Sequence, residues 1–364
     1  MEKNDLTLCI IAKNEAKGLR RAVESAAPMV RETIIGVDTT SNDNTLDIAR
    51  SLTPNVFLFS FKNDFSEARN NLAATAKTGW ILWLDGHEYI NKSIDFAKTQ
   101  SPDADGFLIA KQYNDGPKFY EPKILRRDVK FAGAIHEQPQ CKKVAQLLEP
   151  LIIHDRPGGQ AAGSIQIKNE QREKMMNEIM LAELRKNKKN LHAIFQMAIY
   201  RQGTGKLKEA CHYFEQYLKY QPKNNPNFMV YLNFALCLIG RGRIDTARRV
   251  LARGVEKCGQ MWELNLLAGE IEAGQNHHRQ AIVLFNKALI ANTGHQLCFP
   301  LIHEPHKILD MIAREHYLLK EFENAFMSWR GAADIAPDEE LRKLYLKRAA
   351  VISEILRPAG APIA

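Results

Sequence analysis

Four short apolar runs alternate with three segments of helical spacing over the first 85 residues, and this alternation constrains the fold more than any other feature. Each run is long enough for a buried strand and too short for a helix. The runs cover residues 6–12, 32–38, 55–60 and 80–84, and the helical segments cover residues 16–27, 45–52 and 64–76, with Ser66 as the expected cap of the third. Strands that alternate with helices form parallel sheets covered on both faces. The sequence therefore predicts an α/β domain with a mainly parallel sheet.

Polar side chains follow these predicted strands. Asn14 and Glu15 come after the first strand, Asp38 ends the second, and Asp85 and His87 come after the fourth. The carboxyl ends of parallel strands meet at one edge of a sheet, where ligands bind. These residues could instead only cap helices and solvate loops, but the convergence of several acids favours a nucleotide site. No GxGxxG or GxxxxGK[ST] motif occurs, which argues against dinucleotide oxidoreduction and P-loop hydrolysis.

Asp85, Gly86 and His87 end the apolar run at residues 80–84. A carboxylate and an imidazole two residues apart, on a turn relaxed by glycine, could hold one divalent cation. The alternative is a strand that simply ends in a polar turn, and this segment alone supports both interpretations equally.

The chain continues with further strands and then changes character. Residues 105–110, 119–127 and 151–154 are predicted strands, and the breaker-rich stretch at 156–163 marks a domain boundary. A charged helix over residues 165–188 then leads to an all-helical part.

The helical part is repetitive. Small residues recur with spacings of 37, 34 and 44 residues, at Ala210, Ala247, Ala281 and Ala325. A period near 34 with small residues at helix crossings is typical of tetratricopeptide solenoids, and a capping helix is expected over residues 338–356. Solenoids present a concave surface, which here could hold a peptide acceptor, a carrier or another subunit.

The long third spacing predicts an insertion over residues 292–306. It contains His295, Cys298, His303 and His306, which could bind zinc. Irregular loops also collect such residues, so a loop without metal is the favoured interpretation.

Composition narrows the class of protein. A length of 364 residues suggests two domains, and a net charge of +8 suits anionic partners, although no aromatic-interleaved basic motif points to nucleic acid. The six cysteines include no CxxC pair, which fits a reducing compartment and argues against a zinc or disulfide framework. The start is acidic and no apolar stretch approaches about 18 residues, so we expect no secretory signal, no transmembrane segment and a cytoplasmic location.

Four motifs, found in this order, resemble family 2 glycosyltransferases. They are IAKNE at 11–15, VDTTSNDNT at 37–45, DFSEARN at 64–70 and GWILWLD at 79–85. The likeness covers residues 6 to about 156 and is greatest to a bacterial subgroup that fuses a GT-A catalytic domain to tetratricopeptide repeats, among them the glycosyltransferases of glycopeptide bacteriocins. It implies a nucleotide-sugar donor, expected to be a UDP-sugar, a divalent metal on the diphosphate, and inversion at the anomeric carbon.

The resemblance also implies roles for single residues. Asp38 would contact the uracil or the ribose of the donor. Asn14, Glu15, Asp64 and Arg69 would shape the nucleotide pocket.

Asp85 takes the first position of the family's DxD motif, and His87 takes the third, where an aspartate is usual. Because imidazole is a better ligand for Mn²⁺ than for Mg²⁺, we expect Mn²⁺ to be preferred, with Mg²⁺ as the second choice. His154 stands where GT-A enzymes often have a C-terminal metal-binding histidine, and it is the expected third ligand.

The segment FAGAIHE at 131–137 resembles the acceptor-side motif of the subgroup. An inverting transferase needs a base that deprotonates the acceptor as it attacks the anomeric carbon. Glu137 is the expected catalytic base, and His136 is the second candidate. For His136 and His154, a buried, hydrogen-bonded core histidine is the alternative role.

These inferences predict a GT-A domain over residues 1–156, a connector over 157–190 and a tetratricopeptide-repeat domain over 191–364. The predicted function is inverting, metal-dependent transfer of a sugar from UDP to a peptide or protein acceptor presented on the repeat domain, in a chain that could form a homo-oligomer. Two alternatives stay open. One is an inactive scaffold that only binds nucleotide, and the other is a transferase that acts on a lipid-linked or polysaccharide acceptor.

Overall fold

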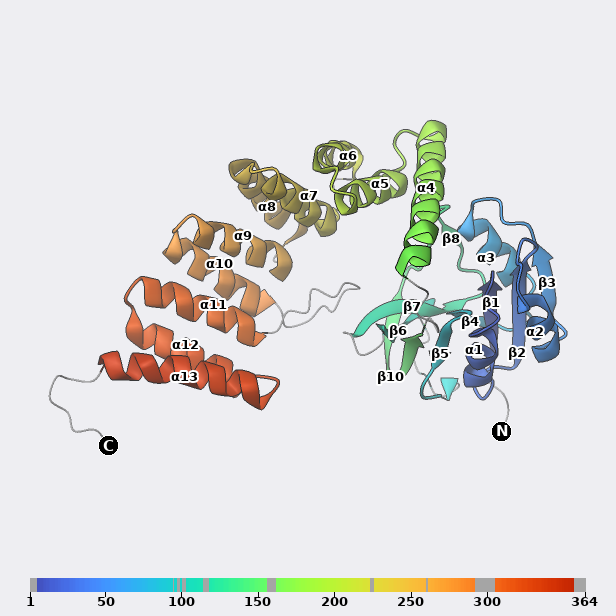
Figure 1. The fold of residues 1–364 in the computed structure, drawn as a ribbon, viewed down its shortest axis with the longest axis horizontal. Helices are drawn as coiled ribbons and strands as arrows, with labels where there is room; N and C mark the ends of the chain where they lie inside the picture. The colour runs from blue at the N-terminus through green and yellow to red at the C-terminus, as the bar shows by residue number, and fades with distance from the viewer. Residues whose placement is uncertain are drawn as a thin grey trace. The chain divides into compact units, whose positions relative to one another are not determined.

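The computed structural model describes residues 5–93, 95–96, 99, 103–113, 118–155, 162–222, 226–259, 261–291 and 305–356. The contacts within the chain define two compact units. One contains the described residues up to Ala193, and the other contains those from Ile194 onward. Figure 1 labels the helices and strands of both units.

The first unit is built on an eight-stranded mixed sheet. In the order of the sheet, its strands are β3 (Val56–Phe59), β2 (Glu32–Asp38), β1 (Leu6–Ala12), β4 (Trp80–Asp85), β7 (Lys118–Arg126), β6 (Gly106–Tyr113), β10 (Val144–His154) and β5 (Glu88–Ile90). The four strands from β3 to β4 run parallel, and β6 runs parallel to β10, whereas β7 and β5 are antiparallel to their neighbours. A separate two-stranded ladder pairs β8 (Phe131–Ala132) with β9 (Gln138–Pro139).

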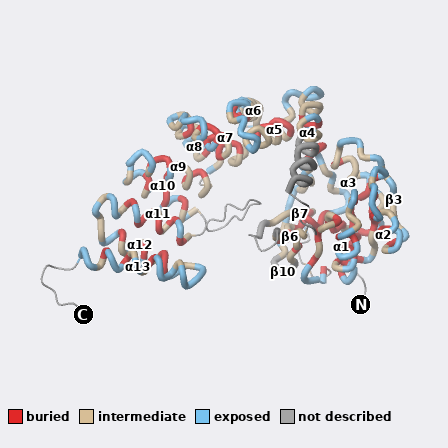
Figure 2. Tube along the Cα trace, in the orientation of Figure 1, coloured by how far each residue is buried: buried red, intermediate tan, exposed pale blue. Residues whose placement is uncertain are grey.

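Strand β1 explains why the sheet has helices on both faces. Its side chains alternate between two hydrophobic clusters, because Leu8 and Ile10 pack on one face and Cys9 packs on the other. The first cluster includes α1 (Leu19–Ala26) and α2 (Thr45–Leu52), and the second includes α3 (Phe65–Ala73). Central strands buried on both faces read as unbroken apolar runs rather than alternating ones. In Figure 2, red marks the buried residues of this unit. The long helix α4 (Ala162–Lys186) also belongs to this unit.

The second unit consists of helices that pack mainly on their neighbours along the chain. They are α5 (Leu191–Gly203), α6 (Leu207–Tyr220), α7 (Phe228–Gly240), α8 (Ile244–Cys258), α9 (Trp262–Gly274), α10 (His278–Ala291), α11 (Pro305–Leu318), α12 (Phe322–Asp334) and α13 (Glu339–Leu356). The four repeat alanines on α6, α8, α10 and α12 are each fully buried. Small buried residues at regular helix crossings are what a helical solenoid requires. The predicted order, an α/β unit followed by helical repeats, is confirmed.

Some predicted boundaries were wrong. Helix α3 is capped by Asp64 and not by Ser66, because Asp64 is extended and its Oδ1 accepts the Glu67 N–H at 2.9 Å. The Ser66 hydroxyl instead donates to the same oxygen at 2.7 Å. Helix α1 begins at Leu19 rather than at residue 16, after turns in the loop that leaves β1.

Some sequence predictions fall outside the described residues. These are the breaker-rich stretch at 156–161 and the candidate zinc ligands His295, Cys298 and His303. The fourth candidate, His306, is 2% exposed, and its Nδ1 lies 2.8 Å from the Tyr345 hydroxyl in the core of the helical unit. None of the described helices combines the length and the apolar character that crossing a bilayer requires.

Candidate active site

The carboxyl ends of β2, β1 and β4 form one edge of the sheet. These strands are parallel neighbours, with Ala12 paired to Val37 and Ile11 paired to Asp85. The loops that leave this edge are therefore adjacent. Five of the predicted site residues lie on them or at the strand ends, namely Asn14, Glu15, Asp38, Asp85 and His87.

Asp38 is a buried carboxylate at the end of β2, with 2% of the residue exposed. Its Oδ1 accepts two hydrogen bonds of 2.9 Å from the backbone N–H and the hydroxyl of Thr40, and Oδ2 lies 3.1 Å from Nζ of Lys13. Burial raises the pKa of the Asp38 carboxyl, but the bonds from Thr40 and the charge of Lys13 outweigh it and hold this pKa below its usual value. Lys13 was not predicted from the sequence, because nothing about a lysine beside Asn14 indicates that it reaches the neighbouring strand.

The loop after β1 is tied to the loop after β2. Asn14 has a left-handed φ of 57°, which asparagine adopts more readily than most residues, and its Oδ1 accepts the Asn42 N–H at 2.8 Å. The Glu15 N–H donates to Oγ1 of Thr45, also at 2.8 Å. The Asn14 side chain therefore shapes this loop, and its contact with a nucleotide stays a prediction.

The turn after β4 packs closely against the loop after β1. The Asp85 N–H donates to Oε2 of Glu88 at 3.0 Å. A Cβ added to Gly86 would lie 2.7 Å from Cβ and Cγ of Glu15, and one added to Gly18 would lie 2.5 Å from the carbonyl oxygen of Gly86. No side chain fits at such distances, so both close approaches require glycine.

His87 lies in this turn with its ring largely shielded from solvent. Its Nδ1 is 2.9 Å from Oε1 of Glu15. Its other ring nitrogen, Nε2, is buried and has no hydrogen-bond partner within the part of the chain that the structure describes. The ring meets that of His154 edge to face, with 4.5 Å between the centroids. Glu15, which was predicted to shape the nucleotide pocket, therefore lies beside His87, and His87 contacts His154. Both histidines were predicted to bind the metal.

Glu88 is fully buried beside them and is surrounded by two lysines and a histidine. Its carboxylate lies 2.5 Å from Nζ of Lys111, 2.8 Å from Nζ of Lys123 and 3.7 Å from Nδ1 of His154. Burial raises the pKa of the Glu88 carboxyl, but Lys123 in particular holds it well below its usual value. This network was not predicted from the sequence. The available signal was Lys111 within β6 and Lys123 within β7.

Arg69 of α3 joins Asp85 to the predicted base. Its Nε lies 2.6 Å from Oε1 of Glu137, and a terminal nitrogen lies 3.4 Å from Oδ1 of Asp85. The guanidinium is also 5.0 Å from the centre of the Trp83 ring. Burial and the neighbouring Glu88 raise the pKa of the Asp85 carboxyl, but nearby cations outweigh them and hold it below its usual value.

Hydrogen bonds from α3 to the backbone of β8 and of the segment after it hold these residues in place. The Phe65 N–H donates to the Ala134 carbonyl at 2.9 Å, and the Asn70 amide exchanges two hydrogen bonds with the backbone of Phe131. Glu137 is thereby brought to Arg69. His136 is instead exposed on the surface, with a left-handed φ of 50°.

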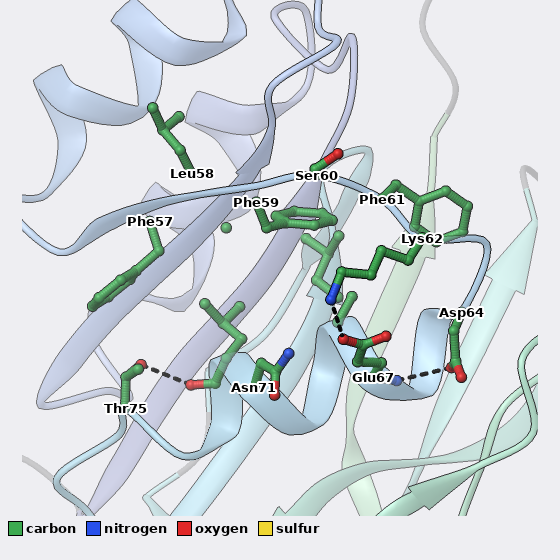
Figure 3. A pocket seen from close by; sticks show the side chains of 14 residues that line it. Phe57, Leu58, Phe59, Ser60, Phe61, Lys62, Asp64, Glu67, Asn71 and Thr75 are labelled. Atoms are coloured by element: carbon green, nitrogen blue, oxygen red, sulfur yellow. Dashed lines mark hydrogen bonds and ion pairs between the residues drawn. The ribbon is translucent and has the colours of Figure 1, made fainter.

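Asp64 has a structural role at the start of α3, which Figure 3 shows. It also lines a cavity of about 330 Å³ between β3 and α3, together with Phe59 and Phe61. Lys62 and Glu67 form an ion pair of 2.9 Å beside it. The contact of Asp64 with a nucleotide stays a prediction.

The donor atoms at the turn after β4 fit one divalent cation in part. Asp85 offers a carboxylate whose side chain is 36% exposed, and His87 offers a buried nitrogen without a partner. Among the described residues, however, no group of three His, Cys, Asp or Glu side chains could hold an ion by itself. Phosphate oxygens and water would have to complete the shell, and His154 as a third ligand stays a prediction.

Comparison with known proteins gives one family match and several relatives. The model of the family described as "Glycosyl transferase family 2" matches residues 7–203. The SPbeta prophage-derived glycosyltransferase SunS of Bacillus subtilis (strain 168) is 29% identical over 157 residues, which cover 38% of this chain and 36% of that protein. The TPR repeat-containing protein Synpcc7942_0270 of Synechococcus elongatus is 30% identical over 140 residues, covering 36% of this chain and 34% of that protein. The chain thus spans about a third of the length of these curated relatives.

Solved structures resemble part of the chain. The C-terminal part of a TPR repeat-containing protein from Cytophaga hutchinsonii aligns with a TM-score of 0.43 and 14% identity, covering 54% of this chain and 72% of that one. The TPR protein YrrB aligns with a TM-score of 0.37 and 18% identity, covering 50% of this chain and 86% of that one. At these TM-scores the assignment of helical repeats rests on the spacing and packing of this chain's own helices.

Proposed function

Because this chain belongs to glycosyl transferase family 2, we propose that it transfers a sugar, with inversion, from a UDP-sugar to a peptide or protein acceptor. The observation that carries the proposal is the line of ion pairs from Asp85 through Arg69 to Glu137. It connects the edge of the sheet where a nucleotide would bind to the segment with the expected base. Asp38 ends β2, which is the second strand from β4 in the same sheet.

Asp38 and Lys13 are the groups best suited to the nucleoside. The carboxylate can accept a hydrogen bond from a uracil N–H or a ribose hydroxyl, because Thr40 and Lys13 keep it ionised. The ammonium of Lys13 is half-exposed and adds positive charge at the mouth of the site. Both groups suit a nucleotide more than a neutral sugar.

Glu137 would act as the catalytic base. Arg69 holds it through Oε1, which fixes the direction of the carboxylate. The other oxygen would take the acceptor proton while the acceptor atom forms its bond to the anomeric carbon and the bond to the diphosphate breaks. Attack from the face opposite the leaving UDP gives inversion.

Asp85 and Nε2 of His87 would hold the divalent cation. When bound, such a cation neutralises charge on the leaving diphosphate. The imidazole is the reason to expect Mn²⁺ before Mg²⁺. Arg69 lies beside Asp85 and orients its carboxylate from the α3 side.

The peptide or protein acceptor is supported by two features. The motifs resemble a subgroup that glycosylates peptides, and helical solenoids present concave surfaces that suit extended chains. The relative SunS carries only the name of a glycosyltransferase, so the acceptor rests on these features.

The test is a transfer assay with a set of UDP-sugars and candidate peptides, with and without Mn²⁺, that measures UDP release and the mass of the acceptor. We expect one UDP-sugar to be consumed, Asp85→Ala to abolish turnover, and Asp103→Ala to leave it unchanged. Asp103 is the matched control because its side chain is 76% exposed and, among the described residues, forms an ion pair with Lys143 alone. Tight UDP binding without turnover on any acceptor would favour the inactive scaffold. Transfer only to a lipid-linked or polysaccharide acceptor would favour the other alternative.

A further inference from the structure

We propose that Glu15 is a positioning residue that holds His87 in the tautomer whose Nε2 can bind a divalent cation. The inference rests on the proposed function for the identity of the cation site, and it changes the role of Glu15. From the sequence, Glu15 was expected to shape the nucleotide pocket. Its side chain instead faces the predicted metal ligand.

The hydrogen bond between the two side chains determines where the ring proton lies. Oε1 of the Glu15 carboxylate is 2.9 Å from Nδ1 of His87 and can only accept, so Nδ1 carries the hydrogen. In a neutral ring Nε2 then has a free lone pair. A doubly protonated ring would bury a second N–H, at Nε2, which has no acceptor within the described residues.

Metal-binding histidines show this same arrangement. Their second ring nitrogen almost always donates to a carboxylate, a backbone carbonyl or a water, which sets the tautomer and the orientation of the ring. Nε2 of His87 is a buried polar atom that has no hydrogen-bond partner among the described residues. A bound cation would supply the missing partner.

Glu15 is itself held in place. Its backbone N–H donates to Oγ1 of Thr45 at 2.8 Å, and its side chain lies directly over Gly86, where a Cβ would come within 2.7 Å of it. Because Gly86 has no side chain, the carboxylate of Glu15 can reach His87 across the turn after β4.

The remaining groups around His87 leave this assignment intact. His154 meets the ring edge to face from β10, and the Asp155 N–H donates to the His87 carbonyl at 3.0 Å. Neither of these contacts engages Nε2.

The first test measures Mn²⁺ binding to the full chain from the electron paramagnetic resonance signal of free Mn²⁺, without nucleotide and with UDP. We expect Glu15→Ala to weaken binding about 10- to 100-fold, the range found for loss of such a supporting carboxylate. Glu15→Gln retains an acceptor oxygen, so it should stay within a few-fold of the parent protein. In a His87→Ala background, Glu15→Ala should have no further effect. Glu24→Ala is the matched control, since that glutamate on α1 has a side chain that is 63% exposed and, within the part of the chain that the structure describes, forms an ion pair with Arg20 alone.

The second test reads the tautomer in metal-free protein with a proton–nitrogen correlation spectrum of ¹⁵N-histidine, with His87 assigned by its absence in His87→Ala. The expected spectrum has the proton on Nδ1, and Glu15→Ala should shift the population toward Nε2–H. A proton on Nε2 in the parent protein, or equal loss of Mn²⁺ affinity in Glu15→Ala and Glu15→Gln, would overturn the inference. Sugar transfer by a protein that binds no Mn²⁺ would also overturn the inference, but it would support the proposed transferase activity. A protein that binds Mn²⁺ through His87 but transfers no sugar would overturn only the proposed function.

Discussion

Nε of Arg69 lies 2.6 Å from Oε1 of Glu137, so a side chain of α3 forms an ion pair with the segment that follows β8. Only 15% of the Arg69 side chain and 12% of the Glu137 side chain are exposed, which protects the pair from solvent screening. The same guanidinium reaches Asp85 at 3.4 Å. Arg69 therefore orients both the proposed base, Glu137, and the proposed cation ligand, Asp85. Arg69 itself neither takes the acceptor proton nor ligates the cation.

Glu137→Gln should abolish the base while preserving the structure. The amide oxygen can still accept the Arg69 Nε–H, but it cannot take a proton from the acceptor. We expect kcat to fall by about 10²- to 10⁴-fold. The melting temperature and the affinity for UDP should change little, and both are measured alongside kcat. His136→Ala is the matched control from the same segment, and a larger loss of kcat in that variant would make His136 the base.

Asp38→Ala should weaken UDP binding. The change removes a charged hydrogen-bond acceptor at the sheet edge, which should cost about 1.5–3 kcal/mol of binding free energy. Calorimetry of UDP binding measures the loss, with Asp103→Ala as the control. Equal affinities for the variant and the parent protein would remove Asp38 from the nucleotide site.

The fold was predictable because its signals are local. Runs such as Leu6–Ala12 are apolar except for Thr7, as expected for central strands buried on both faces, and the repeat of small residues at Ala247 and Ala281 follows helix geometry. Boundaries were less predictable. Asp64 and Ser66 are both good caps by residue type, and only the backbone conformation of Asp64 decides between them.

The position of some predicted site residues in the fold could be predicted from the sequence, but their contacts could not. Strand order brings Asp85 and Asp38 to one edge, and a βαβ pattern predicts that much. The pairing of Glu15 with His87 depends on a close approach at Gly86, which involves a neighbouring loop and leaves no local pattern. Lys123 is even less predictable, because a lysine in a strand usually points to solvent rather than to a buried acid.

Glu88→Ala should destabilise the first unit more than an exposed substitution would. Glu88 is fully buried, and its loss leaves Lys111 and Lys123 in the core without their counter-charge. Removing one partner of a buried ion pair costs about 3–5 kcal/mol of unfolding free energy. Urea unfolding at pH 7 measures the loss. Glu24→Ala is the exposed control and should stay within about 0.5 kcal/mol of the parent protein.

The pH dependence of this network has a definite sign. The folded-state pKa of Glu88 is depressed, so its stabilisation is present above the unfolded value of about 4.3 and is lost as the pH falls through the folded-state pKa. Burial lowers the pKa of Lys123, but Glu88 outweighs burial and raises it, so that part is present below about pH 10.4 and is lost as the pH rises further. The stability difference between the parent protein and Glu88→Gln should therefore be flat from about pH 5 to 10 and shrink at lower pH. A difference that grows on acidification would contradict the charge assignment.

His87→Asp should change which cation supports catalysis. The substitution recreates the DxD pattern and replaces a nitrogen ligand by a carboxylate, which suits Mg²⁺ better than imidazole does. We expect the ratio of kcat/KM with Mn²⁺ to that with Mg²⁺ to fall about 10-fold or more, by analogy with the size of supporting-ligand effects. Treatment with EDTA should stop transfer by the parent protein, and added Mn²⁺ should restore it. The shorter aspartate also loses the bond to Glu15, so Glu15→Ala should no longer affect activity in the His87→Asp background. Full-rate transfer after EDTA, or an unchanged metal preference in His87→Asp, would show that this turn holds no catalytic cation.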